Sequence, residues 1–194
     1  MWQVLLVILL GFRPYYLDHE APAERSARME TVAKAIEYAA SRATCGGAFS
    51  EWRECSPVYP GDRIELAALL SATAQKETNL ARHVHEGHCF AGECDSVVIR
   101  GQLIHRARSL WQVHFNPAFR EEWPNLLGTA TWPTNDAAWA AALVLSATKQ
   151  RCRTLAGAIS GYVGSPDCRW EGAEDRLNLM RRVEAELRAA LPGG

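Results

Sequence analysis

Six cysteines limit how this chain can fold, because they stand in three pairs that are close in sequence. The pairs are Cys45 with Cys55, Cys89 with Cys94, and Cys152 with Cys168. An even number of cysteines in a compact chain favours disulfides and an oxidising compartment. Six thiols allow fifteen pairings. We expect the three local bridges, each contributing about 2–3 kcal/mol by the chain-entropy model. The alternative is a cytosolic protein with six buried thiols.

Length and composition indicate one globular domain with a substantial core. The chain has 194 residues, of which 48% are hydrophobic and 22% are charged, and both fractions are near the average for soluble domains. The formal net charge is −1, whereas nucleic-acid-binding domains usually carry a basic surplus. We therefore expect no nucleic-acid partner.

The first residues include an apolar run from Val4 to Leu10. The run is long enough for the core of a signal peptide and too short to span a membrane. No Lys or Arg precedes it, and no clear small-x-small cleavage site follows it. We expect residues 1–23 to be a weak export signal or an N-terminal arm, with a linker over 13–24. The protein would then be periplasmic or extracellular, with or without cleavage of the signal, and would have no stable membrane span. The alternative is an N-terminal strand or helix docked on the domain.

Apolar residues recur at helical spacing over residues 24–190, which predicts one mostly α domain. Helices are expected over 24–42, 62–81, 136–149, 154–159 and 172–190. The segment 136–149 is apolar nearly all round, which predicts a central buried helix. The expected N-caps are Asp62, Thr154 and either Thr134 or Asn135. A short strand is expected at 97–99 and a long ordered loop over 116–135.

Glu77 is the candidate catalytic residue. It lies at the C-terminal end of the helix expected over 62–81, on the same stripe as Leu66 and Leu70. A carboxylate on a buried face is costly, and desolvation raises the pKa of a carboxyl group. A raised pKa suits a general acid near neutral pH. The alternative is an ordinary glutamate at a helix end in water.

Two further motifs follow Glu77-Thr78 along the chain. They are Ser109-Leu110-Trp111-Gln112 and Ser160-Gly161-Tyr162-Val163-Gly164. In this order the three motifs resemble the lysozyme-like superfamily, above all the soluble lytic transglycosylases and goose-type lysozymes. That family carries a Glu-Ser at the end of a buried helix, then a Gly-Leu-Met-Gln or Gly-Leu-Trp-Gln turn, then an Ala-Tyr-Asn-x-Gly stretch. The resemblance covers roughly residues 24–190. Ser109 replaces the usual Gly, and Val163 replaces the usual Asn.

The resemblance implies an α+β lysozyme-like fold, with a helical bundle around a buried central helix, at most a small β element and a substrate cleft on one side. It implies a glycosidase that cleaves the β-1,4 bond between MurNAc and GlcNAc in peptidoglycan, either as a lytic transglycosylase or as a lysozyme. Such a protein acts as a monomer on glycan strands and needs no cofactor. Glu77 would be the general acid and base. The substrate-binding residues would be Thr78, Ser109, Trp111, Gln112 and Tyr162.

A second carboxylate would decide the mechanism, because most glycosidases place two acids across the scissile bond. Glu86, Glu93 and Asp95 lie between the first two motifs. If none of them faces Glu77, a single acid protonates the glycosidic oxygen. The N-acetyl or the 6-hydroxyl group of the substrate would then close on the sugar carbon. The transglycosylase likeness implies the 6-hydroxyl route, which gives a 1,6-anhydro product. Attack by water is the other outcome.

Two other functions remain open. One is a non-catalytic glycan-binding module on the same fold. The other is a small zinc-binding domain, since His85, His88, Cys89 and Cys94 are of the types that bind tetrahedral zinc. Their spacing does not match a standard zinc finger. We favour a disulfide-closed loop without metal, in which the histidines are solvated or line the cleft.

Several aromatic and basic residues could contact the glycan. Trp123 and Trp132 offer faces for sugar stacking, although tryptophans in such loops more often pack against the loop itself. Arg106 and Arg108 could contact the acidic lactyl-peptide side of the glycan, and solvation is the equally weighted alternative.

Overall fold

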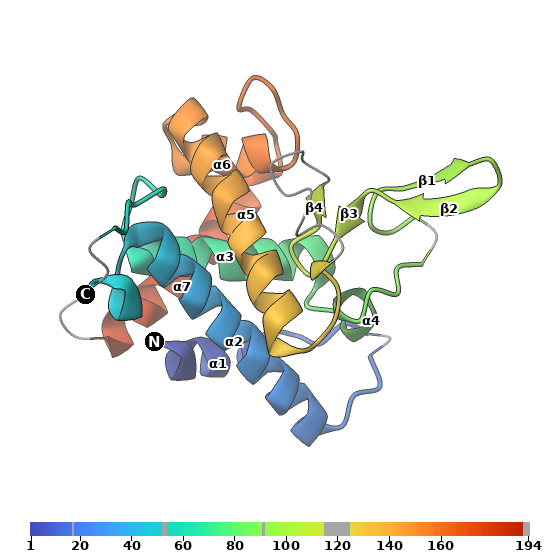
Figure 1. Cartoon of the computed structure of the whole chain (residues 1–194), viewed down its shortest axis with the longest axis horizontal. Helices are drawn as coiled ribbons and strands as arrows, with labels where there is room; N and C mark the ends of the chain where they lie inside the picture. The colour runs from blue at the N-terminus through green and yellow to red at the C-terminus, as the bar shows by residue number, and fades with distance from the viewer. Residues whose placement is uncertain (17, 52–53, 91, 115–124, 192–194) are drawn as a thin grey trace.

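The computed structural model describes residues 1–16, 18–51, 54–90, 92–114 and 125–191. These residues are mostly helical (Figure 1). The helices are α1 (Trp2–Gly11), α2 (Pro22–Thr44), η1 (Gly47–Phe49, a 3-10 turn), α3 (Arg63–Thr78), α4 (Arg82–His85), α5 (Thr131–Cys152), α6 (Leu155–Tyr162) and α7 (Ala173–Ala190). The strands are β1 (Ser96–Ile99), β2 (Gln102–His105), β3 (Ala107–Arg108) and β4 (Val113–His114). A mostly α fold with a small β element is thus confirmed, and its likeness to lysozymes stays a prediction.

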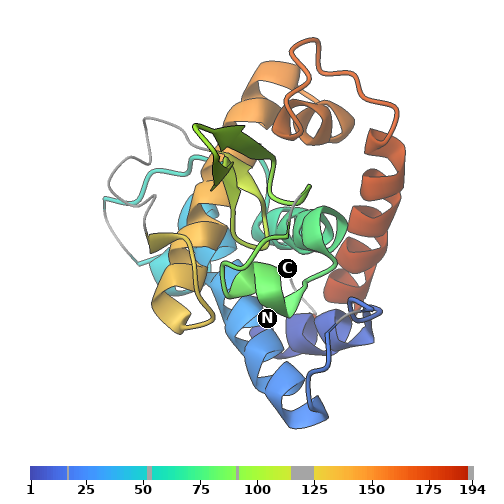
Figure 2. The ribbon, with the colours of Figure 1, turned by 90° about the vertical axis from the view of Figure 1, so that its right-hand side faces the viewer.

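Helix α3 lies in the middle of the molecule, with other helices around it in both views (Figures 1 and 2). Every residue from Leu66 to Ala74 is buried, because the run consists of Ala, Leu, Ser and Thr and can pack on all sides. Helices α2 and α7 pack against α3, while α5 packs against α2 and α6. The enclosed central helix is therefore α3, although α5, which we expected in this place, is also largely buried.

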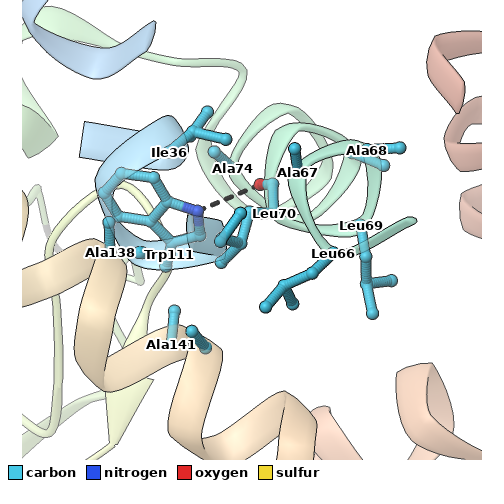
Figure 3. Packing of buried hydrophobic residues seen from close by; sticks show 14 of the residues in the cluster. Ile36, Leu66, Ala67, Ala68, Leu69, Leu70, Ala74, Trp111, Ala138 and Ala141 are labelled. Atoms are coloured by element: carbon cyan, nitrogen blue, oxygen red, sulfur yellow. Dashed lines mark hydrogen bonds between the residues drawn. The ribbon is translucent and has the colours of Figure 1, made fainter. Parts of the chain in front are cut away.

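The core connects α3 to the turn that carries the second motif. The Trp111 side chain is 0% exposed and lies among Ile36, Leu70, Ala138 and Ala141 (Figure 3). Its indole Nε1 donates a hydrogen bond of 3.0 Å to the Leu70 carbonyl oxygen. This bond satisfies the one polar atom of a buried indole and fixes the turn against α3.

Two of the expected helix caps are confirmed. The Asp62 Oδ1 accepts from the Glu65 N–H at 2.8 Å, and the Thr154 Oγ1 accepts from the Gly157 N–H at 3.0 Å. The third cap is misplaced, because α5 begins at Thr131 with Ala130 as its N-cap. Helix α3 ends at Thr78, three residues before the expected end.

The N-terminal apolar run forms α1, which docks on α2 and α7. Leu5 and Leu9 are completely buried in the core, and the Met1 amino group lies 3.3 Å from the Glu37 carboxylate. The docked-helix alternative therefore describes this segment. Within the described residues, no helix is both long and apolar enough to cross a bilayer.

In the segment expected as a linker over 13–24, the described residues before α2, 13–16 and 18–21, form an arm against the helical body, and residues 22–24 begin α2. The buried Arg28 side chain holds Glu20 in a two-pronged ion pair, with hydrogen bonds of 2.6 and 2.7 Å. The same guanidinium donates to the Leu80 carbonyl oxygen at 2.8 Å. Burial raises the pKa of Glu20, but Arg28 outweighs it and holds that pKa below its usual range. The arm is thereby attached to the chain that follows α3.

The three expected disulfides are present: Cys45–Cys55, Cys89–Cys94 and Cys152–Cys168. They are compatible with an oxidising, exported environment. The second bridge precedes the antiparallel β1–β2 hairpin, which projects from the helical body (Figure 1). The expected strand at 97–99 is confirmed as β1, and its partner β2 was not expected.

Candidate functional site

Glu77 opens onto a pocket of about 310 Å³ at the C-terminal end of α3. Its side chain is 17% exposed, so the carboxyl group is largely shielded and still accessible. The polar side chains that line this pocket are Tyr15, Glu77, Thr78, Asn79, Glu93 and Gln112. They come from the arm, from α3 and its end, from the loop before β1 and from the turn of the second motif. We call this cavity the Glu77 pocket.

The Glu77 carboxylate is paired with Arg176 on α7. The guanidinium also lies over the Trp170 ring, 5.0 Å from its centroid. The pair thus places a positive charge directly beside the candidate acid. Sequence reasoning missed this partner, because Arg176 lies 99 residues farther along and on an amphipathic helix that carries several arginines.

Tyr162 connects the third motif to the second. Its hydroxyl donates a hydrogen bond of 2.5 Å to the Trp111 carbonyl oxygen. Burial and the negative charge of Glu77 raise the pKa of Tyr162 well above its usual value, and Arg176 partly opposes this. The phenol therefore stays protonated and remains a hydrogen-bond donor beside the Glu77 charge.

The turn of the second motif requires an unusual backbone at both ends. Ser109 has φ 68° and Gln112 has φ 49°, a left-handed conformation that glycine adopts most easily. Ser109 therefore adopts a backbone conformation that is costly for a residue with a side chain. Further hydrogen bonds hold the turn, among them Trp111 N to Ser109 Oγ (3.3 Å), Gln112 Nε2 to Ser109 O (3.0 Å) and Thr78 Oγ1 to Leu110 O (3.1 Å).

The residues expected to bind substrate divide into two groups. Thr78 and Gln112 line the Glu77 pocket, and Tyr162 lines an adjoining cavity of about 230 Å³ that also includes Gln112. Trp111 and Ser109 are buried and line neither cavity. They support the turn from within, so we correct their expected role in contacting the sugar.

The three candidates for a second acid lie in different places. Glu93 lines the Glu77 pocket. Glu86 lies outside that pocket and pairs with Arg82 at 2.7 Å. Asp95 is also outside it, exposed and 3.7 Å from His114. Among these three, the structure brings only Glu93 to the pocket.

Glu93 is held as a carboxylate. Its Oε2 accepts from the Phe90 N–H at 2.9 Å and bonds to His83 Nε2 at 2.8 Å, while Tyr15 donates to Oε1 at 3.4 Å. Burial raises the pKa of Glu93, but these contacts outweigh it, and the pKa lies below its usual value. Burial, a hydrogen bond with Tyr16 and the charge of Glu93 raise the pKa of Tyr15 to about 12. The pocket therefore holds an ionised glutamate beside a neutral phenol.

The histidine and cysteine cluster does not form a metal centre. Cys89 and Cys94 are joined to each other, His85 is bonded to Thr134 at 3.0 Å, and His88 is exposed. Within the described residues there is no group of three or more His, Cys, Asp or Glu that could hold a metal ion.

Among the remaining candidates for glycan contact, Trp132, Arg106 and Arg108 do not line the Glu77 pocket. Trp132 is 71% exposed on the first turn of α5, so it does not pack against a loop as we expected. Trp123 lies outside the described residues. Arg106 is exposed, and Arg108 is partly buried, which lowers its pKa.

Comparisons with known proteins identify no relative. No family model matches the chain, and no curated protein and no solved structure shows a significant similarity to it.

Proposed function

We propose that this protein cleaves the glycan strands of peptidoglycan at the β-1,4 bond between MurNAc and GlcNAc, with Glu77 as the proton donor. One observation carries the proposal: Glu77, Thr78 and Gln112, from the first two motifs, line one pocket, and Tyr162 of the third motif is bonded to the turn beside it. The order of these motifs, which resembles that of lytic transglycosylases and goose-type lysozymes, supports the same class of reaction.

Two adjoining cavities support a polymeric substrate. The Glu77 pocket and the cavity at Tyr162 share Gln112 as a lining residue. Neighbouring sugars of one strand could occupy the two cavities with the amide of Gln112 between them. The Tyr162 cavity is bounded by Val163, where the resembling family has an asparagine, so its contact with the sugar would be apolar.

The ion pair with Arg176 sets a condition on proton donation. The guanidinium of Arg176 is bonded to Oε1 of Glu77, so it must move before this oxygen can reach a glycosidic oxygen. We propose that a sugar entering the pocket separates Arg176 from Glu77 and excludes water, so that Glu77 takes up a proton. Glu77 then protonates the glycosidic oxygen while the bond from that oxygen to the sugar carbon breaks. The resulting carboxylate accepts the proton of the hydroxyl group that attacks this carbon.

Glu93 supports a lysozyme-type outcome over cyclisation. An ionised carboxylate in the same pocket would stabilise the positive charge that develops on the sugar carbon, or would orient an attacking water. The expected product therefore carries a free reducing end. Products with a 1,6-anhydro sugar would show that the 6-hydroxyl group attacks instead.

The test is digestion of purified peptidoglycan by the full chain, followed by turbidity and by mass spectrometry of the soluble products. Removal of a general acid usually lowers the rate by about 100-fold to 10,000-fold, and we expect a loss of this size for Glu77→Gln. Glu86→Gln is the matched control, because Glu86 does not line the pocket and pairs with the partly exposed Arg82. Equal rates for wild type and Glu77→Gln would end the proposal.

A non-catalytic glycan-binding module is the second candidate. The Glu77–Arg176 pair favours it, because a permanently paired carboxylate cannot donate a proton. Such a module would sediment with peptidoglycan sacculi and release no soluble fragments. Sedimentation of wild type, measured beside the digestion, separates the two functions.

A further inference from the structure

A third cavity, of about 430 Å³, lies between the end of α1, the last turn of α3 and the first half of α7. Three basic side chains line it, Arg13, Lys76 and Arg182, together with one acidic side chain, Asp175. We call this cavity the basic pocket. The sequence analysis singled out none of these four residues.

The charges of the basic pocket are not balanced. Lys76 pairs with Asp175. Arg13 and Arg182 are both exposed side chains, and neither has a hydrogen-bonded or ion-paired partner within the described residues. Two guanidinium groups thus share one cavity without a counterion from that part of the chain. Basic side chains often complement the C-terminal end of a helix, but Arg182 lies in the middle of α7, so this cannot explain its position.

The other lining residues fit an organic anion. Asn79 and Asn178 offer amide N–H groups, while Phe12 and Leu179 add apolar surface. A guanidinium group matches a carboxylate or a phosphate with two parallel hydrogen bonds. The combination suits a ligand that carries an oxyanion next to a short apolar part.

The basic pocket adjoins the Glu77 pocket. Asn79 lines both cavities, and the consecutive residues Lys76 and Glu77 contribute one side chain to each. We propose that the basic pocket binds an oxyanion group, a carboxylate or a phosphate, of a small ligand. The cavity and its charges carry this proposal alone. If the proposed function also holds, the acidic peptide attached to the glycan is the part of the substrate that reaches the basic pocket.

Isothermal titration of the full chain with two probes tests the site. The probes are the dipeptide alanyl-glutamate, which supplies carboxylates, and inorganic phosphate. The double variant Arg13→Gln/Arg182→Gln should weaken binding by at least about tenfold, since it removes charged hydrogen bonds. Arg181→Gln is the matched control, because Arg181 lies next to Arg182 on α7 and is exposed like it, but does not line the basic pocket. It lies 3.8 Å from Glu174 instead. Its affinity should stay within about twofold of wild type.

Each outcome has a defined meaning. Tighter binding of the dipeptide supports the proposal with a peptide carboxylate as ligand, and tighter binding of phosphate supports it with a phosphate as ligand. No binding of either probe at millimolar concentration, or binding that survives the double substitution, overturns the proposal. Glu77→Gln should bind the dipeptide normally. A chain that binds the dipeptide but leaves peptidoglycan intact would refute the proposed function and leave the basic pocket in place.

Discussion

His85 is a buried side chain with only one of its ring nitrogens bonded. The Thr134 hydroxyl donates to the Ala130 carbonyl oxygen at 2.7 Å, so its oxygen accepts from His85 Nε2 at 3.0 Å. The other nitrogen, Nδ1, has no partner within the described residues. Burial and the charge of Arg28 lower the pKa of His85 to about 3. Folded His85 is therefore neutral at a pH at which an unfolded chain protonates its histidines.

The free energy of unfolding should consequently fall as the pH drops from 6.5 towards 3. In this window the unfolded chain binds one proton more than the folded chain, so stability rises with pH by at most about 1.4 kcal/mol per unit. The stabilisation by His85 is fully present above the pKa of a histidine in the unfolded chain, which is about 6.5. Urea unfolding at about pH 7.5 and about pH 5 measures it, and His85→Gln should reduce the difference. His114→Gln is the control, because His114 is exposed. Equal pH dependence in wild type and His85→Gln would contradict this account.

The sequence of α1 does not show that this helix packs on the core, or which of its sides does so. Its apolar residues face both inward and outward, with Leu9 buried and Val7 71% exposed. Leu9→Ala should lower the free energy of unfolding by about 2–5 kcal/mol through lost burial and an unfilled cavity. Val7→Ala should change it by less than about 0.5 kcal/mol, since surface substitutions usually do. Denaturant unfolding of both variants decides the point. Similar losses for the two would show that α1 is not docked in solution.

The elements that could be predicted are those with a local signal. The apolar period of α2 and α7 and the side-chain caps at Asp62 and Thr154 depend on residues a few positions apart. The arm could not be predicted in this way, because its order depends on Arg28 and on the distant Leu80 carbonyl oxygen. Of the β1–β2 hairpin, only β1 was predicted. Strand β2 was missed because it is largely exposed and has no buried face to mark it.

The residues of the candidate site were likewise predicted only where the signal is local in the sequence. Glu77 and Gln112 were found from short motifs, and the core contact of Trp111 with Leu70 brings these motifs together. The partner Arg176 was missed, because only the packing of α7 against α3 places it there. The sequence offered Glu86, Glu93 and Asp95 as equal candidates for a second acid. Only the folded structure shows that, of these three, Glu93 lines the pocket.

The disulfides contribute to the stability of the whole molecule. They close loops with sequence separations of 10, 5 and 16 residues, each worth about 2–3 kcal/mol in the chain-entropy model. Their sum is comparable with the total stability of a typical domain, about 5–15 kcal/mol. Calorimetry should therefore show a much lower melting temperature in reducing buffer. Among paired Cys→Ser variants, loss of the Cys152–Cys168 bridge should destabilise most and loss of the Cys89–Cys94 bridge least. The reverse order would show that local strain or residual structure outweighs loop length.

The short spacing of the bridged cysteines also bears on how the oxidised protein is made. In an unfolded chain, two thiols meet more often when few residues separate them, because closing a short loop costs less entropy. Each native disulfide joins two cysteines with no other cysteine between them in the sequence. Random encounter in the unfolded chain therefore already favours the correct partners. The chain would then reach its oxidised state with little reshuffling of mismatched bridges, and a newly made molecule should depend only weakly on a disulfide isomerase.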